Sequence, residues 1–119
     1  MNLLANVLVG WVAVLHGFFL VLEMFLWRRP FGRKVFRLTQ EMADQTASLA
    51  ANQGLYNGFL AAGLVWGLTL GSAGFGVKVF FLACVMVAGV FGAATANARI
   101  LVIQALPGAL ALAAVYAAR

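Results

Sequence analysis

The sequence predicts an all-α, polytopic membrane protein with four transmembrane helices in a bundle. Of its 119 residues, 65% are hydrophobic and only 9% are charged, and the mean hydropathy is +1.01. A soluble domain of this size could not bury so much apolar surface, so the expected solvent is lipid. Four long apolar segments occupy most of the chain, and each is about long enough to cross a bilayer.

The four helices are expected in one domain, at about residues 3–27, 48–70, 75–96 and 100–118. At 1.5 Å per residue the first spans roughly 37 Å, which is enough to cross a bilayer with some tilt. The residues 71–74 read as a short turn, and 97–99 as a tight connection. Pro107 is expected to kink the last helix, with neighbouring helices satisfying the freed carbonyl.

A basic loop, residues 28–47, is expected on the cytoplasmic headgroup layer. It holds five of the eight basic residues, namely Arg28, Arg29, Arg33, Lys34 and Arg37. Positive loops face the cytoplasm, and Arg99 falls on the same side of a four-helix topology. Both termini are therefore expected on the non-cytoplasmic side of a cell (inner or plasma) membrane. Within the loop, Thr39 is a predicted N-cap for a helix that continues into the second span.

Several function classes are disfavoured by composition. The net charge of +5 is concentrated in one loop after an apolar helix, whereas nucleic-acid binding needs a folded basic surface with aromatic side chains. One histidine and one cysteine cannot make a zinc cluster. No Gly-rich phosphate loop follows a strand, and no Ser-His-Asp set can be assembled. The pattern therefore predicts no metal site and no nucleic acid, and it identifies neither a cofactor nor a catalytic residue.

Glu23 is the most informative residue, because it lies inside the first apolar segment. Related charged groups cost roughly 2.5 to 3.5 kcal/mol at the centre of a membrane helix, so an intramembrane acid indicates a functional site. His16, the only histidine, precedes Glu23 by nearly two helical turns and shares its face. Histidine is a natural proton shuttle and metal or haem ligand, but it can also simply bond a neighbouring helix.

Polar residues from the other helices are expected at the same cytoplasmic depth as Glu23. Amides can both donate to a carboxylate and accept from a protonated acid. Taken singly, such amides also serve as packing contacts between membrane helices, at about 0.6 kcal/mol each. The predicted ligand-binding set is His16, Glu23, Asn52, Gln53, Tyr56, Asn57, Asn97 and Gln104.

Small-residue seams favour close helix packing, within one chain or between copies of it. They are Gly54-x-x-x-Gly58 and Gly63-x-x-x-Gly67-x-x-x-Gly71. Through either seam the chain is predicted to form a homo-oligomer in the lipid bilayer.

Three stretches together resemble a known family, the domain of unknown function 1304. They are residues 16–27 (HGFFLVLEMFLW), 50–64 (AANQGLYNGFLAAGL) and 104–107 (QALP). The resemblance implies a small four-helix integral membrane protein, with the polar residues of the predicted set in their family positions. It implies no reaction and no substrate.

Three functions compete at this point. The first is a binding or transport module, in which Glu23 takes a proton or cation and the amides orient a small molecule. The second is a membrane enzyme, such as an isomerase or a haem- or quinone-dependent protein, with Glu23 or His16 as acid or base. The third is a structural or assembly factor, in which the polar residues only set packing.

Overall fold

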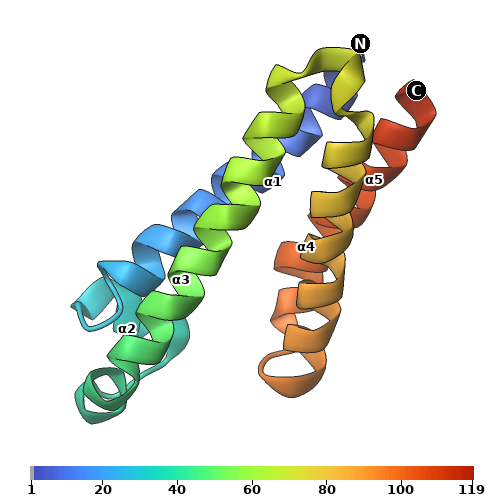
Figure 1. Ribbon diagram of the computed structural model, residues 1–119. Coiled ribbons are helices and arrows are strands. Elements are labelled where there is room, and N and C mark those ends of the chain that lie inside the picture. Colours follow the sequence, from blue (N-terminus) through green and yellow to red (C-terminus); the bar gives the residue numbers. More distant parts are fainter. Residues whose placement is uncertain (1) are drawn as a thin grey trace. The chain divides into compact units, whose positions relative to one another are not determined.

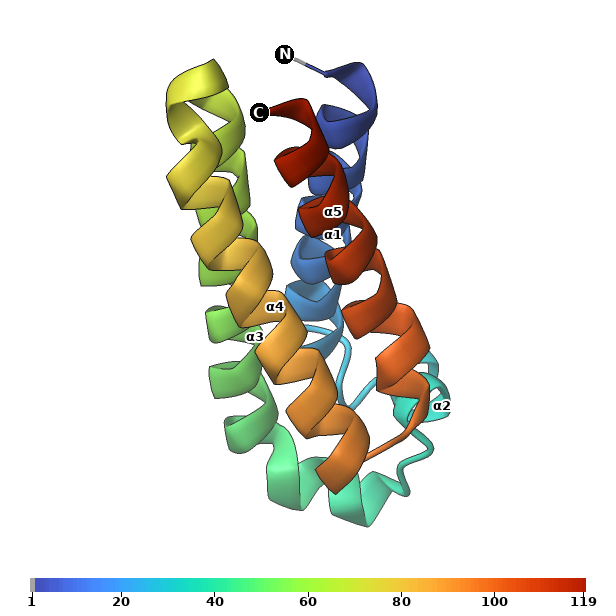
Figure 2. The ribbon, with the colours of Figure 1, turned by 90° about the vertical axis from the view of Figure 1, so that its right-hand side faces the viewer.

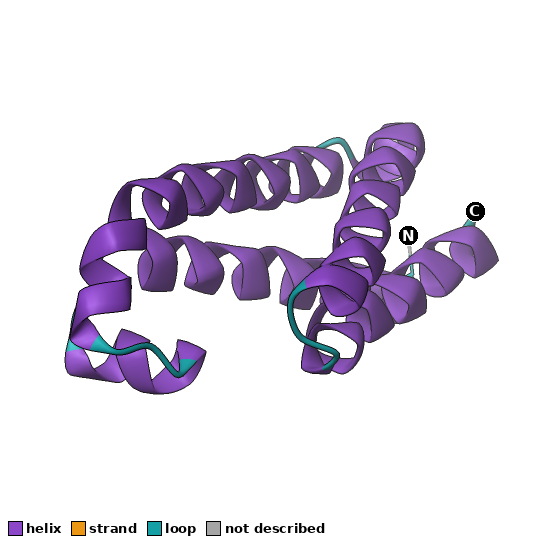
Figure 3. Cartoon of the chain, turned by 90° about the horizontal axis from the view of Figure 1, so that it is seen from below, coloured by secondary structure: helices purple, strands orange, loops and turns teal. Residues whose placement is uncertain are grey.

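The computed structural model describes residues 2–119, and every regular element in that range is helical (Figure 3). The elements are α1 (Leu3–Met24), α2 (Pro30–Phe36), α3 (Gln40–Thr69), the 3-10 turn η1 (Gly71–Gly74), α4 (Phe75–Thr95), the π-helical segment η2 (Leu101–Ala105) and α5 (Leu106–Ala118). The predicted all-α class is therefore confirmed.

Three stretches in residues 2–119 are long and apolar enough to cross a membrane: Leu3–Met24, Gly71–Thr95 and Leu101–Ala118. This supports the predicted membrane character. The 30-residue α3 is not among them. Its hydropathy is lowered by the acids Glu41 and Asp44 near its start and by the amides of the second predicted span, so a fourth span stays a prediction.

The chain divides into two compact units. One combines residues up to Val14 with Leu60–Arg119, and the other is Leu15–Phe59. Because α1 and α3 each continue from one unit into the other, both units contain a piece of each helix.

The larger unit has an apolar core built by four helices. Its buried side chains are Ala5, Val9, Val12, Ala13, Leu64, Leu82, Val85, Ala111 and Val115. In this unit α4 and α5 run side by side in opposite directions (Figures 1 and 2). Gly89 makes this approach possible, because a Cβ there would lie 3.0 Å from the backbone nitrogen of Ala105. The predicted turn over 71–74 is present as η1, entered through Gly71 with a left-handed φ of 62°.

The disturbance expected at Pro107 takes the form of a π-helical segment. The backbone N–H of Leu106 bonds to the carbonyl of Leu101, a wider spacing than in an α-helix. Pro107 occupies the first turn of α5, where its missing N–H costs least.

In the smaller unit, the end of α1 and the first half of α3 run antiparallel, and α2 lies in the connection (Figure 1). The expected bounds need correction here. The first helix ends at Met24 rather than near residue 27, because the chain turns over Phe25–Arg29 so that Pro30 can begin α2. Residues 28–47 are largely helical rather than an open loop. The predicted N-cap is confirmed, since the Thr39 hydroxyl accepts from the N–H of Met42 at 3.1 Å.

Candidate functional site

A hydrogen bond between α1 and α3 fixes the acid of the first membrane helix. The side-chain amide Nδ2 of Asn57 donates to Oε1 of Glu23 at 2.5 Å. Both side chains are half-buried. An amide partner supplies a donor without adding charge, so this bond orients the carboxylate without neutralising it.

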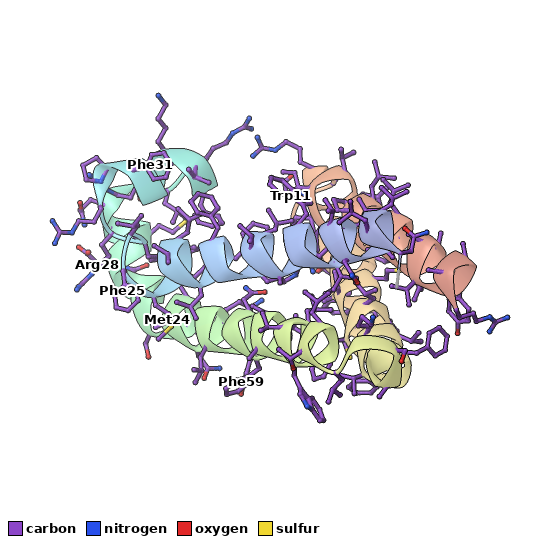
Figure 4. All side chains as sticks on the ribbon, turned by 90° about the horizontal axis from the view of Figure 1, so that it is seen from above. Trp11, Met24, Phe25, Arg28, Phe31 and Phe59 are labelled. Carbon is purple, nitrogen blue, oxygen red and sulfur yellow. The ribbon has the colours of Figure 1, made fainter. Side chains whose placement is uncertain are left out.

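A cavity of about 400 Å³ adjoins the Glu23 side chain. It lies entirely within the smaller unit, where Met24, Phe25 and Arg28 are seen at the end of α1 (Figure 4). Its walls come from the end of α1, the turn that follows it and one face of α3. The lining residues are Glu23, Met24, Phe25, Trp27, Arg28, Arg29, Ala47, Ser48 and Ala51.

Small residues on α3 explain why the cavity exists beside a close helix contact. Gly54 meets α1 directly, since a Cβ there would lie 2.7 Å from Cγ of Met24 and 3.1 Å from Cβ of Glu23. One and two turns earlier on α3, Ala51, Ser48 and Ala47 carry too little side chain to fill the space that opens. The helices therefore touch at Gly54 and leave a hollow towards the N-terminus of α3.

The turn that lines the cavity after α1 is held by a second set of contacts. The indole N–H of Trp27 donates to the Thr46 hydroxyl at 3.0 Å, and its ring packs on Phe36 at 4.7 Å between centroids. Gly32 allows α2 to fold back onto this turn, because any Cβ at that position would lie 1.8 Å from the carbonyl oxygen of Leu26. Trp27 thus ties α2 and α3 together.

His16 occupies a different environment from Glu23. It is fully buried, with 0% exposure, and its ring packs edge-to-face on Phe19 at 5.4 Å. It does not line the cavity. The role of His16 as a ligand therefore stays a prediction.

The other polar residues of α3 point elsewhere. Asn52, Gln53 and Tyr56 are exposed, and the Tyr56 ring packs near Phe59 at 6.0 Å. Asn57 is the member of the α3 set that reaches the carboxylate, because it lies on the same face as Gly54, three residues away.

Asn97 and Gln104 belong to the larger unit and make local bonds there. The Asn97 side-chain oxygen accepts from the backbone N–H of Arg99 at 2.9 Å, which shapes the connection between α4 and η2. The Gln104 amide donates to the carbonyl of Val85 on α4 at 3.2 Å. The Gln104 bond is of the interhelical packing kind that membrane helices use.

Sequence reasoning missed the basic and hydroxyl lining of the cavity. From the sequence, Arg28 and Arg29 indicate only how the protein is oriented in the membrane, and Ser48 is only the first residue of a predicted span. A second missed residue is Lys78 of α4, which is only 3% exposed and packs its stem against Gly67. Its position inside an apolar segment is the signal that could have singled it out.

The glycine seams pack helices of one chain. Gly54 and Gly58 face Met24 and Leu20 of α1, while Gly63 and Gly67 face Phe81 and Lys78 of α4. A homo-oligomer through these seams finds no support: these four glycines already face helices of the same chain, and Gly71, where a Cβ would meet nothing within 4 Å, lies in the turn η1.

Comparison with known proteins identifies the family of this chain. Residues 10–116 match a family described as "Protein of unknown function (DUF1304)". The chain belongs to that family. It is also 27% identical over 114 residues to the "Uncharacterized protein YpaA" of Lactococcus lactis subsp. lactis, which covers 94% of this chain and 96% of the relative. No solved structure matches the chain. The predicted family resemblance is confirmed, and it brings no activity with it.

Proposed function

We propose that this is a multi-pass protein of the cell membrane that binds, and in the simplest case carries, a small molecule with a cationic group. The binding site is the cavity beside Glu23. One observation supports this most directly: an acid within an apolar helix is held by an amide, at the wall of a cavity of about 400 Å³. Ligand pockets measure about 300 to 1,000 Å³, so the occupant is small.

The chemistry of the acid supports a cationic partner. Asn57 donates to Oε1 of Glu23, and the carboxylate offers its second oxygen, Oε2, to a ligand. If the acid only held helices together, a neutral side chain would do so without the cost of placing a charge in an apolar helix. An ammonium or similar cation would balance that charge.

The membrane topology is part of the same proposal. At 1.5 Å per residue the 30 residues of α3 measure about 45 Å, enough to cross a bilayer and extend beyond it. A contact with α1 offsets part of the polarity of α3, since Asn57 bonds to Glu23. With α3 as the fourth span, the basic segment 28–37 faces the cytoplasm and both termini face outward. The cavity then opens at the cytoplasmic end of α1.

Thermal stabilisation by a simple cation tests the site. Purified protein in detergent would be melted with ethylammonium chloride and with sodium chloride at equal ionic strength. A ligand that binds the folded state at 100 times its Kd stabilises it by about 2.7 kcal/mol, which raises Tm. We expect a rise specific to ethylammonium in the wild type that is absent in Glu23→Gln.

Glu41→Gln is the matched control, because Glu41 is an exposed acid on α3 outside the cavity. It should keep the full stabilisation. Equal Tm changes in all three proteins would contradict the proposal and favour a purely structural role for Glu23.

A further inference from the structure

Charges of both signs line the cavity, and this narrows the chemistry of its occupant. Glu23 lies at one side, in the last turn of α1, and Arg28 and Arg29 follow in the next turn of chain. The carboxylate's hydrogen-bond partner is the neutral Asn57, so this bond leaves the charge of Glu23 for a ligand. A simple cation would meet two guanidinium groups, and a simple anion would meet the carboxylate.

Backbone hydrogen bonds fix the turn that carries the two arginines of the cavity lining. The N–H of Arg29 bonds to the carbonyl of Leu26 at 3.1 Å, and the Arg29 carbonyl accepts from the N–H of Arg33 at 2.9 Å. The Arg28 carbonyl accepts from Nε of the Arg33 side chain at 3.1 Å. Arg28 and Arg29 therefore project from a fixed turn, and their long side chains are free to close on an anion.

We propose that the cavity binds a small zwitterion, with its ammonium group at Glu23 and its oxyanion, a phosphate, at Arg28 and Arg29. This inference rests on the proposed function and names the class of ligand. Guanidinium groups suit phosphate because each presents five N–H donors in a planar fork. Ser48 adds a hydroxyl to the opposite wall, where it can serve either end of the ligand.

The order of the charges along the chain favours a soluble zwitterion over a lipid headgroup. Glu23 belongs to the apolar stretch Leu3–Met24, and the arginines lie beyond it. A ligand entering from water would lead with its ammonium group. In an aminophospholipid the phosphate lies next to the acyl chains and the amine points outward, which is the opposite order.

The test compares three soluble probes by isothermal titration of the full-length protein in detergent. O-phosphoethanolamine carries both charges, ethylammonium lacks the anion, and inorganic phosphate lacks the cation. Ethylammonium forgoes the contacts with two arginines, and inorganic phosphate forgoes the single contact with Glu23. Each exposed charge pair changes Kd by up to about 5-fold. We expect O-phosphoethanolamine to bind more tightly than either other probe, by up to about 25-fold over ethylammonium and up to about 5-fold over phosphate.

Matched charge variants distinguish binding by the arginines of the cavity from a general effect of the protein's net charge. Arg28→Gln with Arg29→Gln should remove the advantage of O-phosphoethanolamine over ethylammonium. Lys34→Gln with Arg37→Gln removes the same charge from exposed positions outside the cavity and should leave the advantage intact. Glu23→Gln should abolish ethylammonium binding while sparing that of phosphate.

The outcomes distinguish the two proposals. If ethylammonium binds through Glu23 but O-phosphoethanolamine binds no more tightly, the zwitterion inference is wrong and the cation site stands. If no probe responds to Glu23→Gln, both are wrong. A lipid headgroup as the ligand is tested by adding phosphatidylethanolamine in mixed micelles. If this lipid displaces O-phosphoethanolamine at a concentration lower than that of the soluble compound, the occupant of the cavity is a lipid headgroup and not a soluble zwitterion.

Discussion

Asn57 on α3 donates its amide to Glu23 on α1 at 2.5 Å, although the two residues are 34 positions apart in the sequence. The bond lies one helical turn from the contact of Gly54 with α1. Close packing and polar pairing thus fix the same part of the helix pair, and the cavity begins where that packing ends.

The Asn57–Glu23 bond should be measurable as a coupling energy. Asn57→Ala is expected to lower the free energy of unfolding by about 1 kcal/mol, given about 0.6 kcal/mol for an average intramembrane hydrogen bond and more for a charged acceptor. In a double-mutant cycle with Glu23→Ala, the two losses should not add. Asn52→Ala, at an exposed position on the same helix, is the control and should change stability much less. Full additivity in the cycle would argue against the bond.

The packing of α2 on the turn after α1 depends on Gly32. Gly32→Ala would place a Cβ 1.8 Å from the Leu26 carbonyl oxygen, a backbone atom that cannot move aside. We expect a loss of about 1 to 3 kcal/mol in unfolding free energy, the usual range for overpacking. Gly17→Ala in α1 meets nothing within 4 Å and should be neutral or stabilising by up to about 1 kcal/mol. Equal thermal melts for the two variants would refute the contact of α2 with Leu26.

The turn that ends α2 contains a correctable strain. Arg37 caps this helix with a left-handed φ of 56°, which costs an L-residue about 1 to 2 kcal/mol. Glycine adopts that conformation freely but loses more entropy on folding, so Arg37→Gly should stabilise the protein by about 0.5 to 1 kcal/mol. Arg29→Gly, at an extended φ of −78°, should not stabilise it. A melt in which Arg37→Gly is the less stable variant would contradict this geometry.

Topology is tested independently of ligand binding. If α3 is a fourth span, a periplasmic-type reporter fused after Arg119 should be active, and one inserted in the basic segment 28–37 should be inactive. With three spans, the insertion and the C-terminal fusion would not show this pattern. Cytoplasmic activity of the C-terminal fusion would overturn the proposed orientation.

Much of the architecture follows from local pattern. Hydropathy predicts α1, α4 and the helix ending at Ala118, because each is apolar on all sides. Thr39 is readable as an N-cap because its hydroxyl bonds locally. The end of α1 was less readable: Phe25 and Trp27 are apolar, yet the chain has already turned there to let Gly32 approach Leu26.

The site was only partly predictable. Glu23 stands out because a charge in an apolar helix is costly. Its partner does not, since the i, i+4 spacings on α3 define faces but do not say which face meets α1. Arg28 and Arg29 have an evident role in membrane orientation, which hides a second role at the cavity. That role depends on how the turn folds, and the sequence pattern does not encode it.

The most direct test of a ligand at Glu23 is native mass spectrometry of protein extracted gently from its own membranes. Wild type, Glu23→Gln and Glu41→Gln would be compared in parallel. We predict a bound small molecule of one defined mass on the wild type and on Glu41→Gln, and its loss from Glu23→Gln. The same adduct on Glu23→Gln, at the same occupancy, would contradict the assignment of this cavity as the binding site.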